Sequence, residues 1–483
     1  MTENLKAKTL SGMIWSFVQR FGTMAISFVS NIILARLLTP DDYGTIGMLM
    51  IFIAVANTFV DGGFGSALIQ KKEPTKEDYS TIFWWNMLLS VVLYGLLFLG
   101  APAVARFYNL PLLCDVLRVQ GIVLIINALS IIQQNQLRKQ LKFKRLATIT
   151  VISATLSAGI AIILAYMGWG VWALVAQQLM LSGFNAVQLW ILNKWYPAFV
   201  FSKKSFKQLF SFGGFILASN LINTFCNEIK GLLIGRFFSP ATLGFYTQAY
   251  KLEQVVSTSF SNVVDQVSYP VLAELQNNNE SLKRTLKKIT TAISFITTPL
   301  MLIMALVAHP LILFLYTDKW LPSVYYFQVL CIAGIAICLQ NISYHAVASK
   351  GKSKDLFVWT IIKRTLGIII IVAGMALWGI NGLIWGATIA AWVLLLINLY
   401  LVEKHVGYKL WQQLKDLLPI FILAALCYLI VYGFNMVSPF GTYTTGLLSV
   451  IIYITLYLGI SYSLKLNILL DIRQIVNERL KRK

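Results

Sequence analysis

Long apolar runs recur along the whole chain, and they constrain its fold more than any other feature of the sequence. Apolar stretches of about 20 residues alternate with short polar segments, and about 20 helical residues cross the hydrocarbon core of a bilayer. The composition agrees, because 58% of the 483 residues are hydrophobic and 12% are charged. In a soluble protein about a quarter of the residues are charged. This chain has too few charged residues to cover the surface of soluble domains. We therefore predict an all-α polytopic membrane protein.

The sequence predicts fourteen transmembrane helices. None of the polar segments between them is long enough to hold a soluble catalytic domain. The predicted spans cover residues 11–36, 43–66, 81–102, 114–134, 147–167, 169–192, 209–232, 241–268, 289–308, 322–342, 355–377, 381–402, 416–437 and 443–465.

Basic residues are divided unequally between the two sides of the predicted membrane. If the N-terminus is inside, 30 of the 40 Lys and Arg residues lie in cytoplasmic segments, five lie outside and five lie within spans. Cytoplasmic loops of membrane proteins carry an excess of Lys and Arg. Both termini are therefore expected in the cytoplasm. The formal charge of +21 then reports topology, and we expect no nucleic acid partner.

An internal repeat with a period near 200 residues divides the chain. Residues 35–44 (ARLLTPDDYG) match residues 235–244 (GRFFSPATLG), with Arg, Pro and Gly at equivalent places, and later matches follow at offsets of 209 and 210. Each copy holds six spans, so both copies cross the membrane in the same sense, which is typical of transporters. The predicted parts are two pseudo-symmetric six-helix lobes, 1–208 and 209–415, two additional helices within 416–465, and a basic cytoplasmic tail, 466–483.

Polar side chains at membrane depth predict a cavity. Ionisable groups there are costly and are functional candidates by default. Arg20 lies near the middle of the first span and Lys251 near the middle of the eighth, each on a polar stripe with helical spacing. A positive, hydrated chamber suits an anionic cargo such as a phosphate or pyrophosphate. The predicted cavity residues are Arg20, Lys251, Lys363, Arg364, Gln248, Gln254, Asn220, Asn223 and Asn227.

Each of these assignments has a plainer alternative. Ser, Thr and Asn side chains also join membrane helices by hydrogen bonds, which explains the neutral positions equally well. Lys363 and Arg364 can extend toward the aqueous edge instead. Glu253 can pair with a basic residue on another span or carry a coupling proton, and with Asp265 it is our candidate for ion coupling.

A glycine pair ends the second span near the predicted cytoplasmic face. Asp61, Gly62 and Gly63 are candidates for a gate, because glycines permit a helix break or close helix approach. Plain helix termination explains them equally well.

The sequence offers no pattern for catalysis or for metal binding. The five cysteines lie in apolar stretches without a CxxC pair, and the three histidines lie at loop ends without ligand spacing. We therefore expect no catalytic residue, no metal and no cofactor.

Three short motifs carry a resemblance to a known family. They are residues 12–15 (GMIW), the turn 35–44 and residues 61–70 (DGGFGSALIQ). They resemble the polysaccharide transporters of the MOP superfamily, the Wzx-type flippases, and are most similar to the colanic-acid-type branch. The resemblance covers essentially the whole chain and implies a MATE-like architecture.

This resemblance also implies a function. It implies that undecaprenyl-pyrophosphate-linked oligosaccharide moves from the inner to the outer leaflet of a bacterial inner membrane, for export of surface polysaccharide such as O-antigen or exopolysaccharide. Alternating access and coupling to a cation gradient are implied as well. The expected partners are this lipid-linked oligosaccharide and membrane lipids, with a polysaccharide polymerase and the export machinery as further candidates.

Three other classes of protein remain alternatives. A multidrug antiporter of the same superfamily shares the architecture, but cationic drugs favour buried carboxylates, and this predicted midplane holds four cations and one carboxylate. A membrane polymerase or sugar transferase needs a large outer loop or an acidic cluster, and we find neither. A channel leaves the repeat unexplained.

Overall fold

The computed structural model of the protein describes residues 2–351 and 353–464. The side chains described are those of all these residues except 2–10, 261–267, 269, 353, 354 and 357. In this part of the chain every regular element is a helix, which confirms the predicted all-α class. The chain divides into two compact units, unit 1 (Met1–Thr247) and unit 2 (Gln248–Lys483).

Most helices belong to one unit, while α10 (Pro240–Glu274) begins in unit 1 and continues in unit 2. Unit 1 also contains α1 (Thr2–Leu37), α2 (Pro40–Asp61), α3 (Phe64–Gln70), α4 (Lys76–Tyr108), α5 (Leu112–Gln120), α6 (Ile122–Lys139), α7 (Phe143–Tyr166), α8 (Val171–Asn193) and α9 (Lys203–Phe237). Unit 2 also contains α11 (Asn279–Leu306), α12 (Ala308–Tyr316), the 3-10 turn η1 (Asp318–Trp320), α13 (Ser323–Ser349), α14 (Ser353–Val406), α15 (Leu410–Val437) and α16 (Thr442–Ser463).

Eleven of the described helices are long and apolar enough to cross a membrane. One of them lies within α14, where non-helical backbone at Trp378 and Gly379 divides a 54-residue helix. This break falls between the predicted spans 355–377 and 381–402. The helices α8 and α10 are not among the eleven. The multi-pass membrane fold is therefore confirmed, and the count of fourteen spans stays a prediction.

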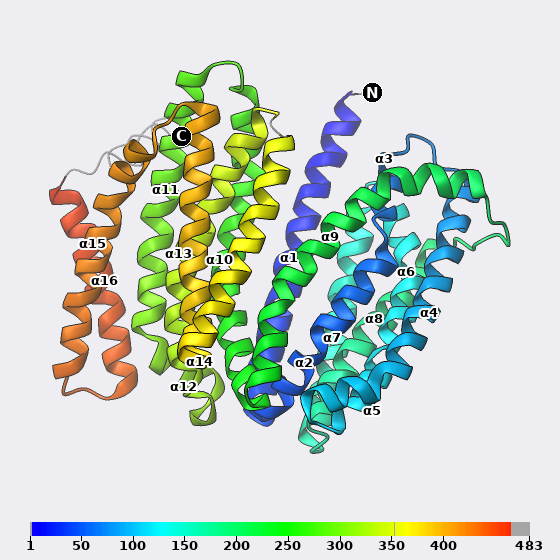
Figure 1. The fold of residues 1–483 in the computed structure, drawn as a ribbon, viewed down its shortest axis with the longest axis horizontal. Helices are drawn as coiled ribbons and strands as arrows, with labels where there is room; N and C mark the ends of the chain where they lie inside the picture. The colour runs from blue at the N-terminus through cyan, green and yellow to red at the C-terminus, as the bar shows by residue number, and fades with distance from the viewer. Residues whose placement is uncertain (1, 352, 465–483) are drawn as a thin grey trace. The chain divides into compact units, whose positions relative to one another are not determined.

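The helices of unit 1 pack into one bundle. Figure 1 shows α4, α6, α7 and α8 side by side, and α1 also packs along α7. Alanine and serine lie at many of the buried positions of α7, including Ala154, Ser157, Ala158 and Ala161. Small residues let membrane helices approach closely, because packing rather than exclusion from lipid holds such helices together.

The predicted second span is broken in the structure. Helix α2 ends at Asp61, and Gly62 and Gly63 both have the left-handed backbone, with φ of 58° and 69°. A Cβ atom at Gly63 would lie 2.4 Å from the carbonyl oxygen of Gly213 on α9. The glycines therefore turn the chain into α3 and also let α9 approach the turn through its backbone.

The two copies of the repeated turn contact each other within unit 1. A Cβ atom at Gly44 would lie 1.8 Å from the carbonyl oxygen of Pro240, and one at Gly244 would lie 2.0 Å from that of Pro40. Equivalent residues thus exchange equivalent contacts, as they do about a two-fold axis. The glycines are required because any larger residue at either position would force the two helix starts apart.

Local sequence fixes where α2 begins. Thr39 Oγ1 accepts a hydrogen bond from the backbone N–H of Asp42, and the Asp42 carboxylate accepts one from the N–H of Thr39 at 2.9 Å. This reciprocal pair is a capping box, and Pro40 occupies the first helical position, where a missing N–H costs nothing. The equivalent helix start at α10 is capped by Ser239, whose Oγ accepts from the N–H of Thr242.

Unit 2 has its own apolar core around α13. Residues of α11, α13, α14 and α15 form one buried cluster, and Phe295 with residues of α15 and α16 forms another. Tyr457 Oη donates to the carbonyl oxygen of Phe295 at 3.1 Å, which joins α16 to α11. Lys287 on α11 pairs with Asp416 on α15 at 2.7 Å.

The compact units and the repeat divide the chain at different places. The repeat predicts a second lobe that starts at residue 209, within α9. In the structure α9 packs on α2, α3 and α4, so unit 1 extends through α9 to Thr247. The assignment of lobes by the repeat stays a prediction.

Candidate functional site

Arg20 lies exposed on α1, far from both ends of the helix. Among the described residues its guanidinium has no hydrogen bond or ion pair. The neighbouring Thr23 hydroxyl donates to the carbonyl oxygen of Gln19 at 2.7 Å, so part of the polar stripe is satisfied by α1 itself. Arg20 is thus an accessible cation at predicted membrane depth.

Lys251 is the corresponding cation of α10 and is also exposed. Its stripe is not uniform. Gln248 is completely buried, whereas Gln254 is half-buried and donates from Nε2 to Tyr250 Oη at 2.7 Å. Lys251 is therefore the accessible charged member of these three predicted cavity residues.

Lys363 has a protein partner. Its Nζ donates to Asn398 Oδ1 at 2.7 Å, which joins the two arms of α14. Asn398 is 4% exposed, and its Nδ2 reaches the carbonyl oxygen of Gln340 on α13 at 3.5 Å. This chain of contacts agrees with a role in helix packing. Arg364, the next residue, is half-buried.

The predicted asparagines of α9 differ in exposure. Asn220 and Asn227 are exposed and Asn223 is half-buried. Close to them, the hydroxyls of Thr58 on α2 and Thr224 on α9 lie 3.1 Å apart. The helix thus presents polar groups both to a neighbouring helix and to accessible space.

Glu253 is buried among α10, α11 and α13. It is 2% exposed, and a Cβ atom at Gly334 would lie 2.5 Å from its Oε1 and 2.8 Å from Met301 Cε. A carboxylate at this depth is rare unless it serves a function. The side chain of Asp265, the other candidate for ion coupling, lies outside the described residues.

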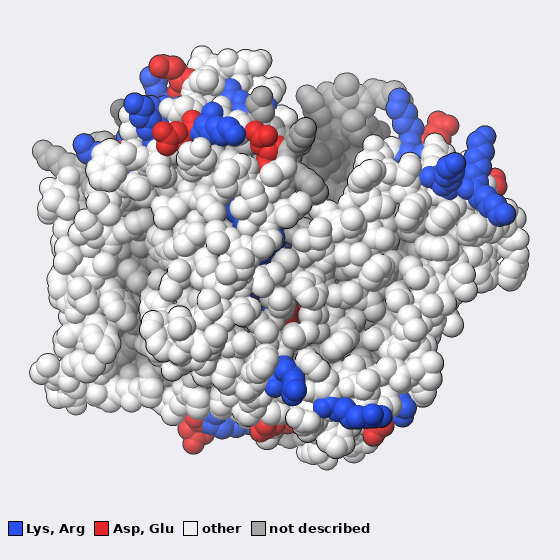
Figure 2. Space-filling model, viewed as in Figure 1, with Lys and Arg blue, Asp and Glu red and all other residues white. Residues whose placement is uncertain are grey.

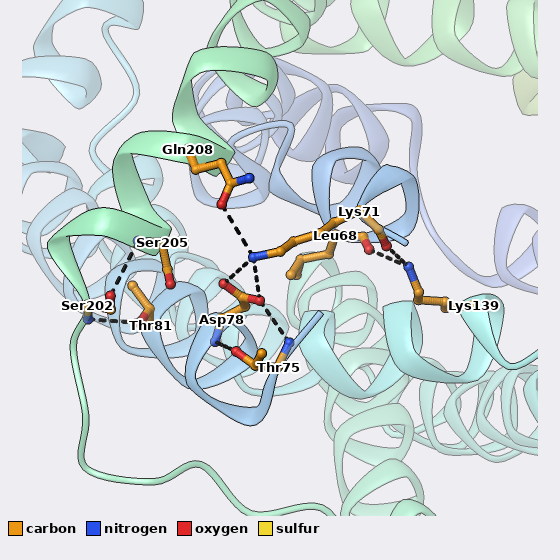
Figure 3. Close-up of polar contacts among 9 residues, drawn as sticks. All are labelled: Leu68, Lys71, Thr75, Asp78, Thr81, Lys139, Ser202, Ser205 and Gln208. Carbon is orange, nitrogen blue, oxygen red and sulfur yellow. Dashed lines mark hydrogen bonds and ion pairs between the residues drawn. The ribbon is translucent and has the colours of Figure 1, made fainter. Parts of the chain in front are cut away.

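Sequence reasoning missed a polar cluster at one end of unit 1, which we call the Lys71 cluster (Lys71, Thr75, Asp78, Lys139 and Gln208). Figure 3 shows Lys71 Nζ between Asp78, at 2.7 Å, and Gln208 of α9, at 3.4 Å. Asp78 is 1% exposed and also accepts from the N–H of Thr75 at 2.8 Å. The sequence pattern that could have predicted part of this cluster is Thr75-x-x-Asp78, which forms a capping box at the start of α4.

Lys139 completes this cluster from α6. Its Nζ donates to the carbonyl oxygens of Leu68 and Ile69 at 3.0 Å each, and to that of Lys71. Carbonyl groups at a helix C-terminus have no partner within the helix and carry a partial negative charge. The cluster therefore holds the end of α3 against α4, α6 and α9.

Few charged side chains lie in the middle of the protein face drawn in Figure 2. On the face shown in Figure 2, Lys, Arg, Asp and Glu gather at the helix ends, and the surface between is almost entirely uncharged. Many large apolar side chains are exposed on the described part of the protein, including Leu88, Leu99, Ile163 and Leu429. A surface of this kind is suited to lipid.

The fold defines the class of protein first. It is similar to that of the lipid II flippase MurJ, with a TM-score of 0.77 and 15% identity over 95% of this chain and all of the other. A multidrug transporter of the MATE family matches with a TM-score of 0.62 and 14% identity, covering 82% and 98% of the two chains. The protein thus has the fold of MOP superfamily transporters, as predicted.

Sequence comparison then gives the family. Residues 33–325, more than half of the chain, match the family described as polysaccharide biosynthesis protein, and the chain belongs to this family. The teichuronic acid biosynthesis protein TuaB of Bacillus subtilis is 28% identical over 90% of each chain. The lipopolysaccharide biosynthesis protein WzxC of Escherichia coli is 22% identical over 85% of this chain and 84% of its own. The predicted resemblance to Wzx-type proteins is confirmed.

Proposed function

We propose that this protein is a flippase for undecaprenyl-pyrophosphate-linked oligosaccharide, which it moves across the bacterial inner membrane by alternating access. The observation that carries this proposal is a polysaccharide biosynthesis family sequence on the fold of a lipid II flippase. When a surface polysaccharide is built on a lipid carrier at the inner face of the membrane, the lipid-linked oligosaccharide has to be moved to the outer face. A flippase supplies that step without bond chemistry, so the protein is not an enzyme.

The pyrophosphate of the cargo binds to accessible cations at membrane depth. Arg20 in unit 1 and Lys251 in unit 2 are the primary candidates, because both are exposed. A guanidinium can hold a phosphate through two parallel hydrogen bonds, and an ammonium adds a point charge. Asn220, Asn223 and Asn227, with Gln248 and Gln254, are candidates for neutral hydrogen bonds to the cargo, and Lys363 and Arg364 are further candidate cations.

The cation gradient drives the cycle through Glu253 or Asp265. When a buried carboxylate binds a cation its charge is neutralised, and the free-energy cost of keeping it buried falls. Cation binding therefore favours the conformation in which the carboxylate is buried. The glycine turn at Asp61, Gly62 and Gly63 serves as a gate, since two left-handed glycines join two helix segments that both touch α9. A polysaccharide polymerase and export machinery then receive the product.

Complementation tests the cation assignment. In a strain that lacks its own flippase, Arg20→Ala and Lys251→Ala should each reduce surface polysaccharide at least tenfold, because a charge-assisted hydrogen bond contributes about 1.5–3 kcal/mol. Arg20→Lys should be intermediate, since it keeps the charge and loses the fork. Arg106→Ala and Lys409→Ala, which remove exposed cations elsewhere, are the matched controls. Full polysaccharide from normally inserted Arg20→Ala and Lys251→Ala would overturn the assignment.

Reporter fusions test the proposed orientation independently. Fusions after Lys144 and after Lys207 should report the cytoplasm, and one near Thr442 should report the outer side. Two inverted results among the three would contradict the fourteen-span topology with both termini inside.

A multidrug antiporter is the second candidate, favoured by the MATE-type fold. It predicts resistance to cationic drugs in cells that express the protein, with no change in surface polysaccharide. Complementation by the wild type without drug resistance would exclude it.

A further inference from the structure

The first part of α9 extends beyond what the membrane core requires. At about 1.5 Å per residue its 35 residues are about 52 Å long, whereas the core is about 30 Å thick. Figure 1 shows the first turns of α9 running across the ends of other unit 1 helices before the helix bends and descends beside α2. The adjacent glycines Gly213 and Gly214 follow these turns, and we call residues 203–212 the α9 arm.

One face of the α9 arm is firmly attached to unit 1. Leu209 is 3% exposed within a cluster that includes Phe64 and Ile82, and the ring of Phe206 lies 4.6 Å from that of Trp85. Gln208 accepts from Lys71 at the polar edge of this face. The backbone N–H of Ser202, the N-cap residue, donates to Thr81 Oγ1 at 3.0 Å (Figure 3). The α9 arm is therefore a fixed element of the bundle.

The exposed surface of the α9 arm combines cations with aromatic rings. Lys203, Lys204 and Lys207 are all exposed, and their spacing places them on one side of the helix. Phe212 is 40% exposed, and Phe210 is 43% exposed although its ring also contacts Phe64 and Phe206. Exposed phenylalanines also flank the arm on both sides, at Phe199, Phe201 and Phe215.

This combination matches one chemical environment. Helices that lie in the membrane interface carry Lys or Arg toward the headgroups and aromatic residues toward the acyl chains. Clustered lysines gain about 1 kcal/mol each near an anionic lipid surface. Nucleic acid or an acidic protein would account for the lysines but would leave the phenylalanines in water.

We propose that the α9 arm is a binding site for the headgroups of anionic phospholipids of the surrounding bilayer. The ammonium groups of Lys203, Lys204 and Lys207 contact lipid phosphates, while the exposed phenylalanines enter the upper acyl region. This site concerns the bilayer and not the transported cargo, so it is distinct from the proposed function. The arm contributes Gln208 to the Lys71 cluster, and Gly213, the next residue after the arm, lies against Gly63 of the α2–α3 turn. Bound lipid therefore stabilises this end of unit 1.

Native mass spectrometry of the purified protein tests the proposal, with phosphatidylglycerol as the anionic probe and phosphatidylcholine as the neutral one. Removing one lysine should weaken phosphatidylglycerol binding about fivefold, and the triple change K203A/K204A/K207A about a hundredfold. Phosphatidylcholine binding should stay unchanged. Higher salt should weaken binding to the wild type and not to the triple variant.

A second triple variant separates the α9 arm from net charge. K404A/K409A/K415A removes three exposed lysines, one near the end of α14, one between α14 and α15, and one in the first turns of α15, and it should bind phosphatidylglycerol as the wild type does. K203R/K204R/K207R keeps the charges and should bind as the wild type does. If the alanine triple fails to fold, the three single alanine variants carry the test, and wild-type binding by all three would overturn the proposal. Wild-type binding by the alanine triple, or an equal loss in the control triple, would overturn the proposal.

Discussion

Apart from the Lys71 cluster at one end of unit 1, the two units bury different polar groups between their helices. In unit 1, neutral amides meet in pairs between helices, as in Asn57–Asn127 at 2.9 Å and Gln120–Gln178 at 2.6 Å. In unit 2, ionisable groups take such positions, as in Glu253 and the Lys363–Asn398 bond. A neutral pair joins helices whatever the ion gradient, whereas a buried charge can respond to it. We therefore expect unit 2 to sense the coupling ion, and we expect these amide pairs of unit 1 to join helices whatever the gradient.

The largest expected effect comes from Glu253. Glu253→Gln keeps the shape that fits against Gly334 and removes the charge. Transport in proteoliposomes should then lose its dependence on a pH or sodium gradient. One coupled charge contributes about 2.3 kcal/mol at 100 mV, or roughly fiftyfold in cargo distribution.

Two variants control for Glu253. Asp265→Asn tests the other candidate, and Glu228→Gln removes a half-buried carboxylate of α9 in unit 1. If transport by both Glu253→Gln and Asp265→Asn stays gradient-sensitive, neither carboxylate couples the ion. Loss of coupling in Glu228→Gln alone would place the sensor in unit 1 and break the comparison.

Asp78 should affect stability and not coupling, because this buried carboxylate of unit 1 lies at a helix end and pairs with Lys71. Asp78→Asn should lower the free energy of unfolding by about 1–3 kcal/mol, measured by thermal unfolding in detergent. The exposed neighbour Glu77 gives the control Glu77→Gln, expected to unfold as the wild type does. A loss of gradient dependence in Asp78→Asn would place a coupling carboxylate in unit 1.

The Lys363–Asn398 bond should show a smaller effect. In a double-mutant cycle of Lys363→Met and Asn398→Leu we expect a coupling energy of about 1–1.7 kcal/mol, the upper range for polar contacts in membrane proteins. If Lys363 serves the cargo directly, transport by Lys363→Met will fall while its thermal stability stays unchanged.

The neutral pair of unit 1 should show the smallest effect. For Asn57→Leu and Asn127→Leu the coupling energy should be about 0.6 kcal/mol, the average for such contacts in membranes, with transport unchanged. A coupling energy above that of Lys363–Asn398 would remove the energetic distinction between the units.

Local and compositional features of the sequence were sufficient for the fold class. Apolar runs predict membrane helices because a chain inside the bilayer has to satisfy its backbone hydrogen bonds internally, which few structures other than a helix can do. Short motifs were sufficient to predict the family. Helix ends were harder to predict. The predicted span 209–232 follows apolar residues, whereas α9 begins at Lys203, because an arm buried on one face needs no continuous apolar run.

Contacts between distant residues could not be predicted. Lys363 and Asn398 are 35 positions apart, and their bond depends on how the two arms of α14 meet. Gly63 was predicted at a helix end, but nothing in the sequence tells that Gly213 lies against it. Arg20 is exposed, and both its place in a cavity and its role with the cargo stay predictions.

The reciprocal contact of the repeated turns has a consequence for biogenesis. The turn at Pro40 and Gly44 cannot form its contact with Pro240 and Gly244 until these residues have been synthesised, 200 residues later. At about 5–20 residues per second, this wait lasts about 10–40 seconds. During that time the first six predicted spans are already in the membrane and α2 lacks its permanent neighbour α9. Unit 1 therefore cannot fold completely while its last segment is still in the ribosome, and a nascent chain that is stopped near residue 208 should be a substrate for membrane quality control.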